Sequence, residues 1–125
     1  MTSILISEDS IPLCSHYRAS FIEAGYQVIT ALDGLHAFAA FEEKRPDLLV
    51  TDYRMPLMDG LALIKTIRET GYHTPVILLS DSDLGLEDGE EESLGKIIIL
   101  QKPVEASTLL KLIEAMLKQG KKQAK

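Results

Sequence analysis

The sequence predicts an α/β fold built on a five-stranded parallel sheet, and two observations support this prediction. Short apolar runs alternate with longer amphipathic stretches along the chain, which is the pattern of repeated strand–helix units. The runs are mostly apolar and end in turn residues, as expected for strands buried on both faces. They occupy residues 4–6, 27–30, 48–51, 76–79 and 97–100.

Three helices between these runs can be placed by a capping residue in front and a glycine or proline behind. The capping residues are Ser10, Asp33 and Asp59, and the helices end at Gly25, before Pro46 and at Gly71. Apolar residues at helical spacing are expected to face the core. They are Leu13, Tyr17 and Phe21 in the first helix, Leu35, Phe38 and Phe41 in the second, and Leu61, Ile64 and Ile67 in the third.

The segment between the fourth and fifth strands, residues 81–95, is a weak helix former. It contains Gly85 and Gly89, and a glycine inside a helix costs about 1 kcal/mol relative to alanine. Acidic residues crowd the segment, and like charges four residues apart, such as Glu87 and Glu91, repel each other. We therefore expect the fourth helix to be short or frayed.

The last helix has the clearest apolar period of the chain. Its inward residues are Leu109, Leu112, Ile113, Met116 and Leu117. The lysine-rich residues that follow have no apolar partner, so we expect one domain over residues 1–118 and a solvated, mobile tail over residues 119–125.

Composition and charge restrict the class of function. With 125 residues and 46% hydrophobic residues, the chain can form one globular domain with a sizeable core. The net charge of −6 disfavours direct binding to nucleic acid, and no apolar stretch reaches the roughly 18 residues that a membrane span needs. The single cysteine, Cys14, and the absence of a basic leader at the N-terminus favour a cytoplasmic location.

Polar side chains follow four of the five strands at the point where each strand ends. Glu8 and Asp9 follow the first strand, Asp52 the third, Ser80 the fourth and Lys102 the fifth. The carboxyl ends of parallel strands lie at one edge of the sheet, where open α/β sheets bind their ligands. We therefore expect these five side chains to share one site.

The chemistry of these groups favours a metal-dependent phosphoryl site. Three neighbouring carboxylates repel one another unless a cation neutralises them, and ligation by a few oxygens suits Mg2+. Lys102 adds a positive charge and Ser80 adds a hydrogen-bond donor, so the expected anion is a phosphoryl group. Asp52 is then the expected nucleophile, because aspartate can carry phosphate as an acyl phosphate whose charge the metal and Lys102 would offset.

These motifs resemble those of response-regulator receiver domains, the phosphoacceptor modules of two-component signalling. The resemblance covers about residues 4–117 and depends on four motifs in order. They are the acidic pair Glu8-Asp9, DYRMPLMDG at residues 52–60, LLS ending at Ser80, and QKP at residues 101–103. The resemblance implies a flavodoxin-like, doubly wound parallel sheet of order 2-1-3-4-5 with helices on both faces.

The resemblance also implies a cofactor and a phosphodonor. Mg2+ would be bound by Asp9, Asp52 and the backbone carbonyl of Arg54, with Glu8 acting through water. Asp52 would be phosphorylated by a phosphohistidine donor, either a histidine kinase or a histidine phosphotransfer protein. Such a domain catalyses only its own phosphotransfer and autodephosphorylation, so we do not expect a turnover enzyme.

The signal, by the same resemblance, would pass through the ends of the fourth and fifth strands. Lys102 would pair with the phosphoryl group, and its peptide bond to Pro103 would be cis. Ser80 would move toward the phosphoryl group and transmit the change to the fourth helix and fifth strand, where a downstream protein partner binds. A homodimer is compatible with this interpretation.

The sequence departs from the family pattern in three places. Ile99 occupies the position, three residues before the lysine, that usually holds Tyr or Phe, so the aromatic part of the switch is missing. Asp81 occupies a position that is usually small, and the fourth helix is the glycine-broken acidic segment described above. We hypothesise that phosphorylation is retained but that phosphate orders residues 81–95 instead of moving an aromatic ring.

Other classes of function stay open on the sequence alone. The departures at Asp81 and Ile99 favour a pseudo-receiver, an interaction module that binds its partner without phosphorylation. An aspartate-based phosphohydrolase typically needs a second aspartate two residues after the nucleophile, where this chain has Arg54. Taken singly, Asp52 could also cap a turn and Lys102 could be a surface lysine.

Overall fold

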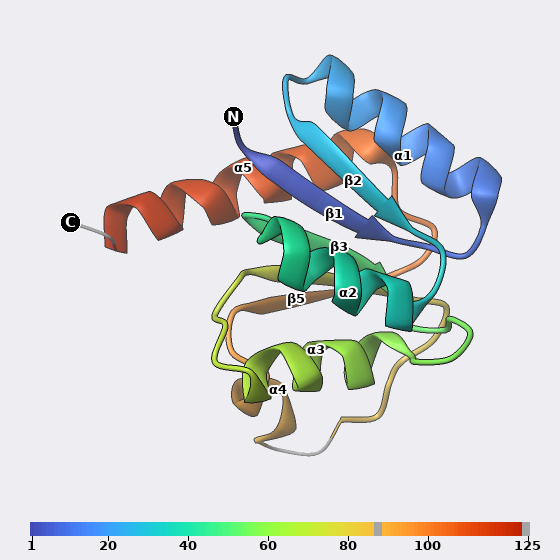
Figure 1. Cartoon of the computed structure of the whole chain (residues 1–125), viewed down its shortest axis with the longest axis vertical. Helices are drawn as coiled ribbons and strands as arrows, with labels where there is room; N and C mark the ends of the chain where they lie inside the picture. Colours follow the sequence, from blue (N-terminus) through green and yellow to red (C-terminus); the bar gives the residue numbers. More distant parts are fainter. Residues whose placement is uncertain (87–88, 124–125) are drawn as a thin grey trace.

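The computed structural model describes residues 1–86 and 89–123, with side chains described up to Gln119. Five parallel strands form one sheet of order β2-β1-β3-β4-β5, which confirms the predicted fold class (Figure 1). The strands are β1 (Ser3–Ser7), β2 (Gln27–Ala31), β3 (Leu48–Asp52), β4 (Val76–Ser80) and β5 (Ile97–Gln101).

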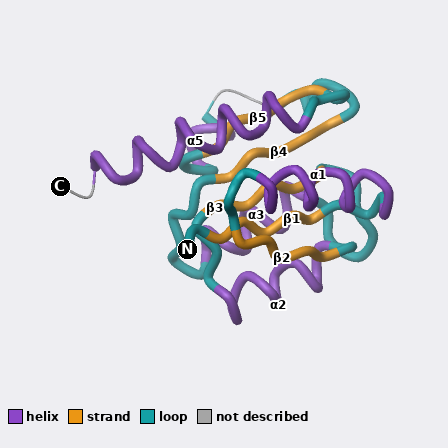
Figure 2. Tube along the Cα trace, turned by 90° about the horizontal axis from the view of Figure 1, so that it is seen from above, coloured by secondary structure: helices purple, strands orange, loops and turns teal. Residues whose placement is uncertain are grey.

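The helices alternate with the strands and cover both faces of the sheet. They are α1 (Ile11–Glu23), α2 (Gly34–Lys44), α3 (Gly60–Glu69), α4 (Glu90–Ser93) and α5 (Ala106–Gln123). α1 packs beside α5 on one face, while α2 packs beside α3 on the other (Figures 1 and 2). The fold is therefore the doubly wound arrangement that the motifs implied.

Two apolar clusters, one on each face, form the core. Successive residues of a strand point to opposite faces, so Ile4 and Ile6 join the cluster under α1 and α5 while Leu5 joins the one under α2 and α3. All five residues of β3 and of β4 are buried, as expected for the central strands of a covered parallel sheet. These two strands carry Asp52 and Ser80 at their ends, so both residues stand at the ends of fully buried strands.

The predicted helix caps are confirmed. The side chain of Ser10 accepts a hydrogen bond from the Leu13 amide at 3.4 Å. The carboxylates of Asp33 and Asp59 accept hydrogen bonds from the amides three residues further on, both at 2.8 Å. Gly25 and Gly71 follow α1 and α3 with φ of 100° and 101°. These glycines adopt the left-handed conformation that ends a helix.

The predicted inward face of α2 is wrong at one residue. Leu35 is 48% exposed, whereas Gly34, Ala37 and Phe41 are buried and Phe38 is partly buried. The reason is the close contact of Gly34 with Met58, which turns the stripe of residues 34, 37 and 41 toward the core. A leucine at the first turn therefore projects outward, although its spacing to Phe38 fits a helical period.

The fourth helix is short, as predicted, since α4 spans only four residues. Glu87 and Asp88, which contribute to the predicted acidic segment, lie outside the described residues. α5 extends to Gln123, so its backbone continues as helix through most of the range predicted to be a tail. The side chains of the tail lysines lie outside the described residues.

Candidate phosphoacceptor site

Two buried carboxylates and one partly buried ammonium meet at the carboxyl edge of the sheet. The Lys102 ammonium lies 2.9 Å from Asp52 Oδ1 and 3.2 Å from Glu8 Oε1. The side chains of Glu8, Asp52 and Lys102 are 3%, 8% and 17% exposed. The register of the parallel strands explains their meeting, because β1, β3 and β5 all end at this edge. The structure thus brings together groups that are 44 and 50 residues apart in the sequence.

Asp9 completes an acidic pocket beside this ion pair. One carboxylate oxygen from each of Glu8, Asp9 and Asp52 can be chosen so that all three lie within 4.8 Å of one another. Asp9 is exposed while the other two are buried, so the pocket opens to solvent on its side. A cluster of carboxylate oxygens is the donor set of a hard divalent cation, and the residues present therefore fit Mg2+.

Burial and mutual repulsion disfavour the charged forms of the two buried acids. Burial raises the pKa of Asp52, and the neighbouring charge of Asp9 raises it further, although Lys102 opposes both effects. Burial also raises the pKa of Glu8, opposed by the Ser10 amide and by Lys102. Burial alone would lower the pKa of Lys102, but its hydrogen bonds and attraction to Asp52 and Glu8 raise it overall. The pocket is therefore deficient in positive charge.

Glycines allow the loop after β3 to approach Asp52 closely. A side chain at Gly60 would overlap with the backbone carbonyl of Asp52 and lie 2.8 Å from the Leu78 side chain. The Gly60 amide donates to the Tyr53 carbonyl at 2.7 Å, which closes the loop on itself. Arg54, whose carbonyl is the predicted metal ligand, lies exposed in this loop two residues after Asp52. In the predicted Asp59-Gly60 turn, Asp59 caps α3, and Gly60 is needed because a larger residue would not fit against Asp52.

Ser80 is located where the sequence predicts, but its hydroxyl does not contact Asp52. The hydroxyl donates to the Ser82 carbonyl at 2.7 Å, and the Ser82 amide lies 3.3 Å from it. The Ser80 backbone carbonyl accepts a hydrogen bond from the Lys102 amide at 2.7 Å. The Ser80 backbone therefore connects β4 to the segment that carries Lys102, while its side-chain hydroxyl is hydrogen-bonded to Ser82 in the loop that follows β4.

Lys102 also lines a cavity that is shared with α1 and with the residues around Pro103. This cavity of about 350 Å³ is lined by Tyr17 of α1, by Asp81, and by Lys102 and Val104. The Lys102–Pro103 bond in its wall is cis, as the resemblance implied. Asp81 is exposed and lines this cavity together with Lys102, but it forms no ion pair with Lys102 among the described residues.

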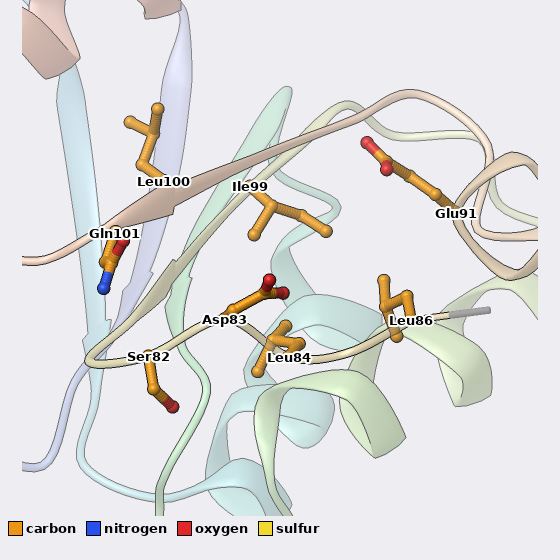
Figure 3. A pocket seen from close by; sticks show the side chains of 8 residues that line it. All are labelled: Ser82, Asp83, Leu84, Leu86, Glu91, Ile99, Leu100 and Gln101. Carbon is orange, nitrogen blue, oxygen red and sulfur yellow. The ribbon is translucent and has the colours of Figure 1, made fainter. Parts of the chain in front are cut away.

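Ile99 lines a separate hollow on the face formed by β5 and α4. A cavity of about 360 Å³ lies between β5 and the segment after β4. Figure 3 shows the Ile99 side chain pointing into this hollow above Leu84, with Leu86 and Glu91 farther along it. The short α4 leaves this part of β5 accessible. At this position, where the resemblance implied an aromatic ring, the aliphatic side chain of Ile99 therefore faces an open hollow with a mixed polar and apolar lining.

Tyr17 has a polar role near the site that the sequence did not reveal. Tyr17 was predicted as a core residue of the first helix, which it is, yet its hydroxyl donates to the Val104 carbonyl at 2.7 Å. A partner 87 residues away leaves no local signal in the sequence. A tyrosine at an inward helical position would have been the only hint, because a buried hydroxyl needs a partner.

Comparison with known proteins identifies the family. The model of the response regulator receiver domain matches residues 4–114, so the chain belongs to this family. Among curated proteins, it is 30% identical over 98% of its length to the uncharacterized transcriptional regulatory protein YclJ of Bacillus subtilis and 32% identical over 99% to AfsQ1 of Streptomyces coelicolor. It covers 53% and 55% of these proteins and thus spans about half their length.

Solved structures give the same result. The chemotaxis protein CheY4 of Vibrio cholerae superposes with a TM-score of 0.82 at 31% identity, covering 92% of this chain and 98% of that one. The Francisella response regulator 1452 receiver domain superposes with a TM-score of 0.84 at 27% identity, covering 96% and 99%. The chain is therefore a receiver domain of the two-component type with the flavodoxin-like fold. No helix among the described residues is long and apolar enough to span a membrane.

Proposed function

We propose that this receiver domain accepts a phosphoryl group on Asp52 in a Mg2+-dependent reaction with a phosphohistidine donor. The observation that carries the proposal is the burial of Asp52 beside both the Lys102 ammonium and two further carboxylates. A purely structural aspartate would need the ammonium, but it would not need a solvent-open acidic cluster next to it. Such a cluster is unfavourable unless a cation occupies it.

The residues have distinct tasks in the proposed transfer. An oxygen of the Asp52 carboxylate attacks phosphorus, the P–N bond to the donor imidazole breaks, and the imidazole nitrogen keeps the bonding electron pair. Mg2+, held by Asp9, Asp52 and the Arg54 carbonyl with Glu8 acting through water, would neutralise phosphoryl charge. Lys102 exchanges part of its contact with Asp52 for a phosphoryl oxygen, which it can reach because it already lies 2.9 Å from the carboxylate.

The donor and the reader of the signal follow from the same proposal. The donor is a histidine kinase or a histidine phosphotransfer protein, and a downstream protein partner binds the phosphorylated form. The domain performs no reaction beyond its own phosphorylation and dephosphorylation. The buried, free Cys14 is compatible with the cytoplasmic setting that this proposal assumes.

The proposed readout uses the segment after β4 and not an aromatic ring. Ser80 would release the Ser82 carbonyl and turn toward the phosphoryl group, which frees the start of the segment to reorganise. Ile99 would follow passively, because it has no polar atom to exchange between partners. By this route, a change at Asp52 would still reach the face formed by β5 and α4, although no aromatic ring is present at residue 99.

Phosphorylation by acetyl phosphate tests the proposal. Incubation with acetyl phosphate and Mg2+ should add one phosphoryl mass, which chelation of Mg2+ and Asp52→Asn should both abolish. Asp33→Asn is the matched control, because asparagine also serves as an N-cap. Absence of any mass gain in the wild-type domain would favour the phosphorylation-independent pseudo-receiver, and continuous turnover of a phosphoester would favour a hydrolase.

A further inference from the structure

The segment that carries Lys102 is fixed to the rest of the fold at two backbone points. The Lys102 amide donates to the Ser80 carbonyl at 2.7 Å, which holds the segment to β4. Two residues later, the Val104 carbonyl accepts the Tyr17 hydroxyl at 2.7 Å, which holds it to α1. Between these points lies Pro103, which has no amide hydrogen to donate. The hydrogen bond from Tyr17 to Val104 thus fixes the segment on the C-terminal side of Lys102.

The Tyr17 hydroxyl is not needed for packing. The ring is 2% exposed and stacks on Phe21 at a centroid distance of 6.0 Å, so a phenylalanine would fill the same space. A buried hydroxyl costs free energy unless it is hydrogen-bonded, and the Val104 carbonyl satisfies it. The hydroxyl therefore serves the connection between α1 and the segment before α5, which are adjacent on one face of the sheet (Figure 1).

The position of this segment decides where the ammonium lies. Lysine reaches its partners through a flexible side chain, so the backbone from which it starts must be well placed. Tyr17, Lys102 and Val104 line the same cavity of about 350 Å³, and Val104 is only partly buried where it packs against the apolar cluster under α1 and α5. The hydrogen bond from the Tyr17 hydroxyl to the Val104 carbonyl is the directional contact that joins this segment to α1, in addition to the backbone bond of Lys102 to β4.

We propose that Tyr17 is a positioning residue for phosphotransfer. Its hydroxyl fixes the segment that carries Lys102 so that the ammonium stays aligned on the phosphoryl group transferred to Asp52. This inference rests on the function proposed above. It assigns Tyr17 no contact with donor or metal, because its effect passes through Lys102.

The test is Tyr17→Phe, measured with acetyl phosphate as the donor. One hydrogen bond is worth roughly 1 kcal/mol, so the maximal rate of Asp52 phosphorylation should fall about three- to tenfold. The Mg2+ dissociation constant should stay within about twofold of the wild-type value, because the carboxylates do not depend on Val104. The matched control is Tyr26→Phe, since Tyr26 packs on the same apolar cluster and its hydroxyl has no side-chain hydrogen bond among the described residues.

Two readouts separate positioning from a merely structural role, and a third result bears on the proposed function. If Tyr17→Phe lowers the melting temperature but phosphorylates at the wild-type rate while folded, the inference is overturned. In a Lys102→Ala background, Tyr17→Phe should leave the residual rate unchanged, and an equal loss in both backgrounds would also overturn it. A wild-type domain that gains no phosphate on Asp52 would instead refute the proposed function itself.

Discussion

The Lys102 ammonium and the Asp52 carboxylate form a contact of 2.9 Å at the carboxyl edge of the sheet, where both side chains are largely buried. A second carboxylate, that of Glu8, lies 3.2 Å from the same ammonium. One cation thus balances two buried anions, and Asp9 adds a third negative charge nearby. The apo site is therefore electrostatically unfavourable in a way that binding a divalent cation and a phosphoryl group would correct.

The stability contributed by Lys102 should disappear at high pH. Its pKa in the folded state lies above the usual lysine value of about 10.4, so the folded state binds this proton more tightly than the unfolded state does. Its contribution is complete below the unfolded pKa and is lost as the pH rises through the folded pKa. The difference in free energy of unfolding between wild type and Lys102→Met should therefore shrink between pH 9 and 12, as measured by denaturant unfolding. A difference that does not change with pH would show that the ammonium charge is not the stabilising feature.

Replacing the proposed nucleophile should stabilise the apo domain. Burial and Asp9 raise the pKa of Asp52, so the ionised form is disfavoured by folding at neutral pH. Asp52→Asn removes this penalty and should raise the free energy of unfolding by about 1 kcal/mol at pH 7, as is common when a functional site is relieved of its constraint. The gain should decline as the pH falls through the raised pKa of folded Asp52 and should vanish below the unfolded pKa of about 3.9. Denaturant unfolding at pH 4, 5.5 and 7 measures this trend, and destabilisation at pH 7 would contradict it.

Mg2+ should stabilise the wild-type domain through the acidic pocket. A ligand present at ten times its dissociation constant adds about 1.4 kcal/mol to the free energy of unfolding. Asp9→Asn should abolish most of this increment, because it replaces the exposed carboxylate of the cluster by a neutral amide. Glu114→Gln is the control, since this glutamate lies on α5 and pairs only with Lys118 among the described ion pairs. Thermal unfolding in MgCl2 and in NaCl of equal ionic strength measures the effect, and equal shifts in both salts would indicate screening alone.

A single methyl group at Gly34 should loosen the edge of the site. A Cβ there would overlap with the Met58 carbonyl and lie 2.6 Å from the Met58 Cβ. Since backbone cannot yield as a flexible side chain does, Gly34→Ala should lower the free energy of unfolding by about 1–3 kcal/mol and displace the loop after β3. Leu35→Ala, at the exposed neighbouring position, should have a much smaller effect. Denaturant unfolding compares the two variants, and equal losses would show that the contact with Met58 is unimportant.

The extent to which the sequence predicts this molecule depends on the range of the interactions involved. The strands, the caps at Ser10, Asp33 and Asp59, and the shared edge of Glu8, Asp52 and Lys102 follow from local patterns and from the geometry of parallel sheets. These features need only short-range spacing and the rule that strand ends meet at one edge.

The features that could not be predicted depend on partners distant in sequence. The Arg68 guanidinium donates to the carbonyls of Leu94 and Lys96, at 2.6 and 3.1 Å, and so holds the end of α4 against α3. The Tyr17 hydroxyl reaches Val104, and Gly34 meets Met58. The spacing of apolar residues along the chain cannot predict such pairings. The outward orientation of Leu35 follows from one of these pairings, the contact of Gly34 with Met58. Ser80 illustrates a further limit, since its position was predictable but the direction of its hydroxyl was not.

The proposed phosphorylation should slow amide exchange in the segment after β4. Residues 81–86 precede the four-residue α4, and the far end of this region is fixed by buried Leu94 and by Arg68. The near end has weaker contacts, which are a 3.5 Å hydrogen bond from Gln101 to the Asp81 carbonyl and the partial burial of Leu84 and Leu86, so we expect the change there. With Mg2+ and beryllofluoride, protection there should increase about tenfold, which corresponds to about 1.4 kcal/mol of local stabilisation. β5 should change little, because it is already paired with β4 along its length. Asp52→Asn under the same conditions should show no change, and unchanged protection in the wild-type segment would contradict a readout through this segment.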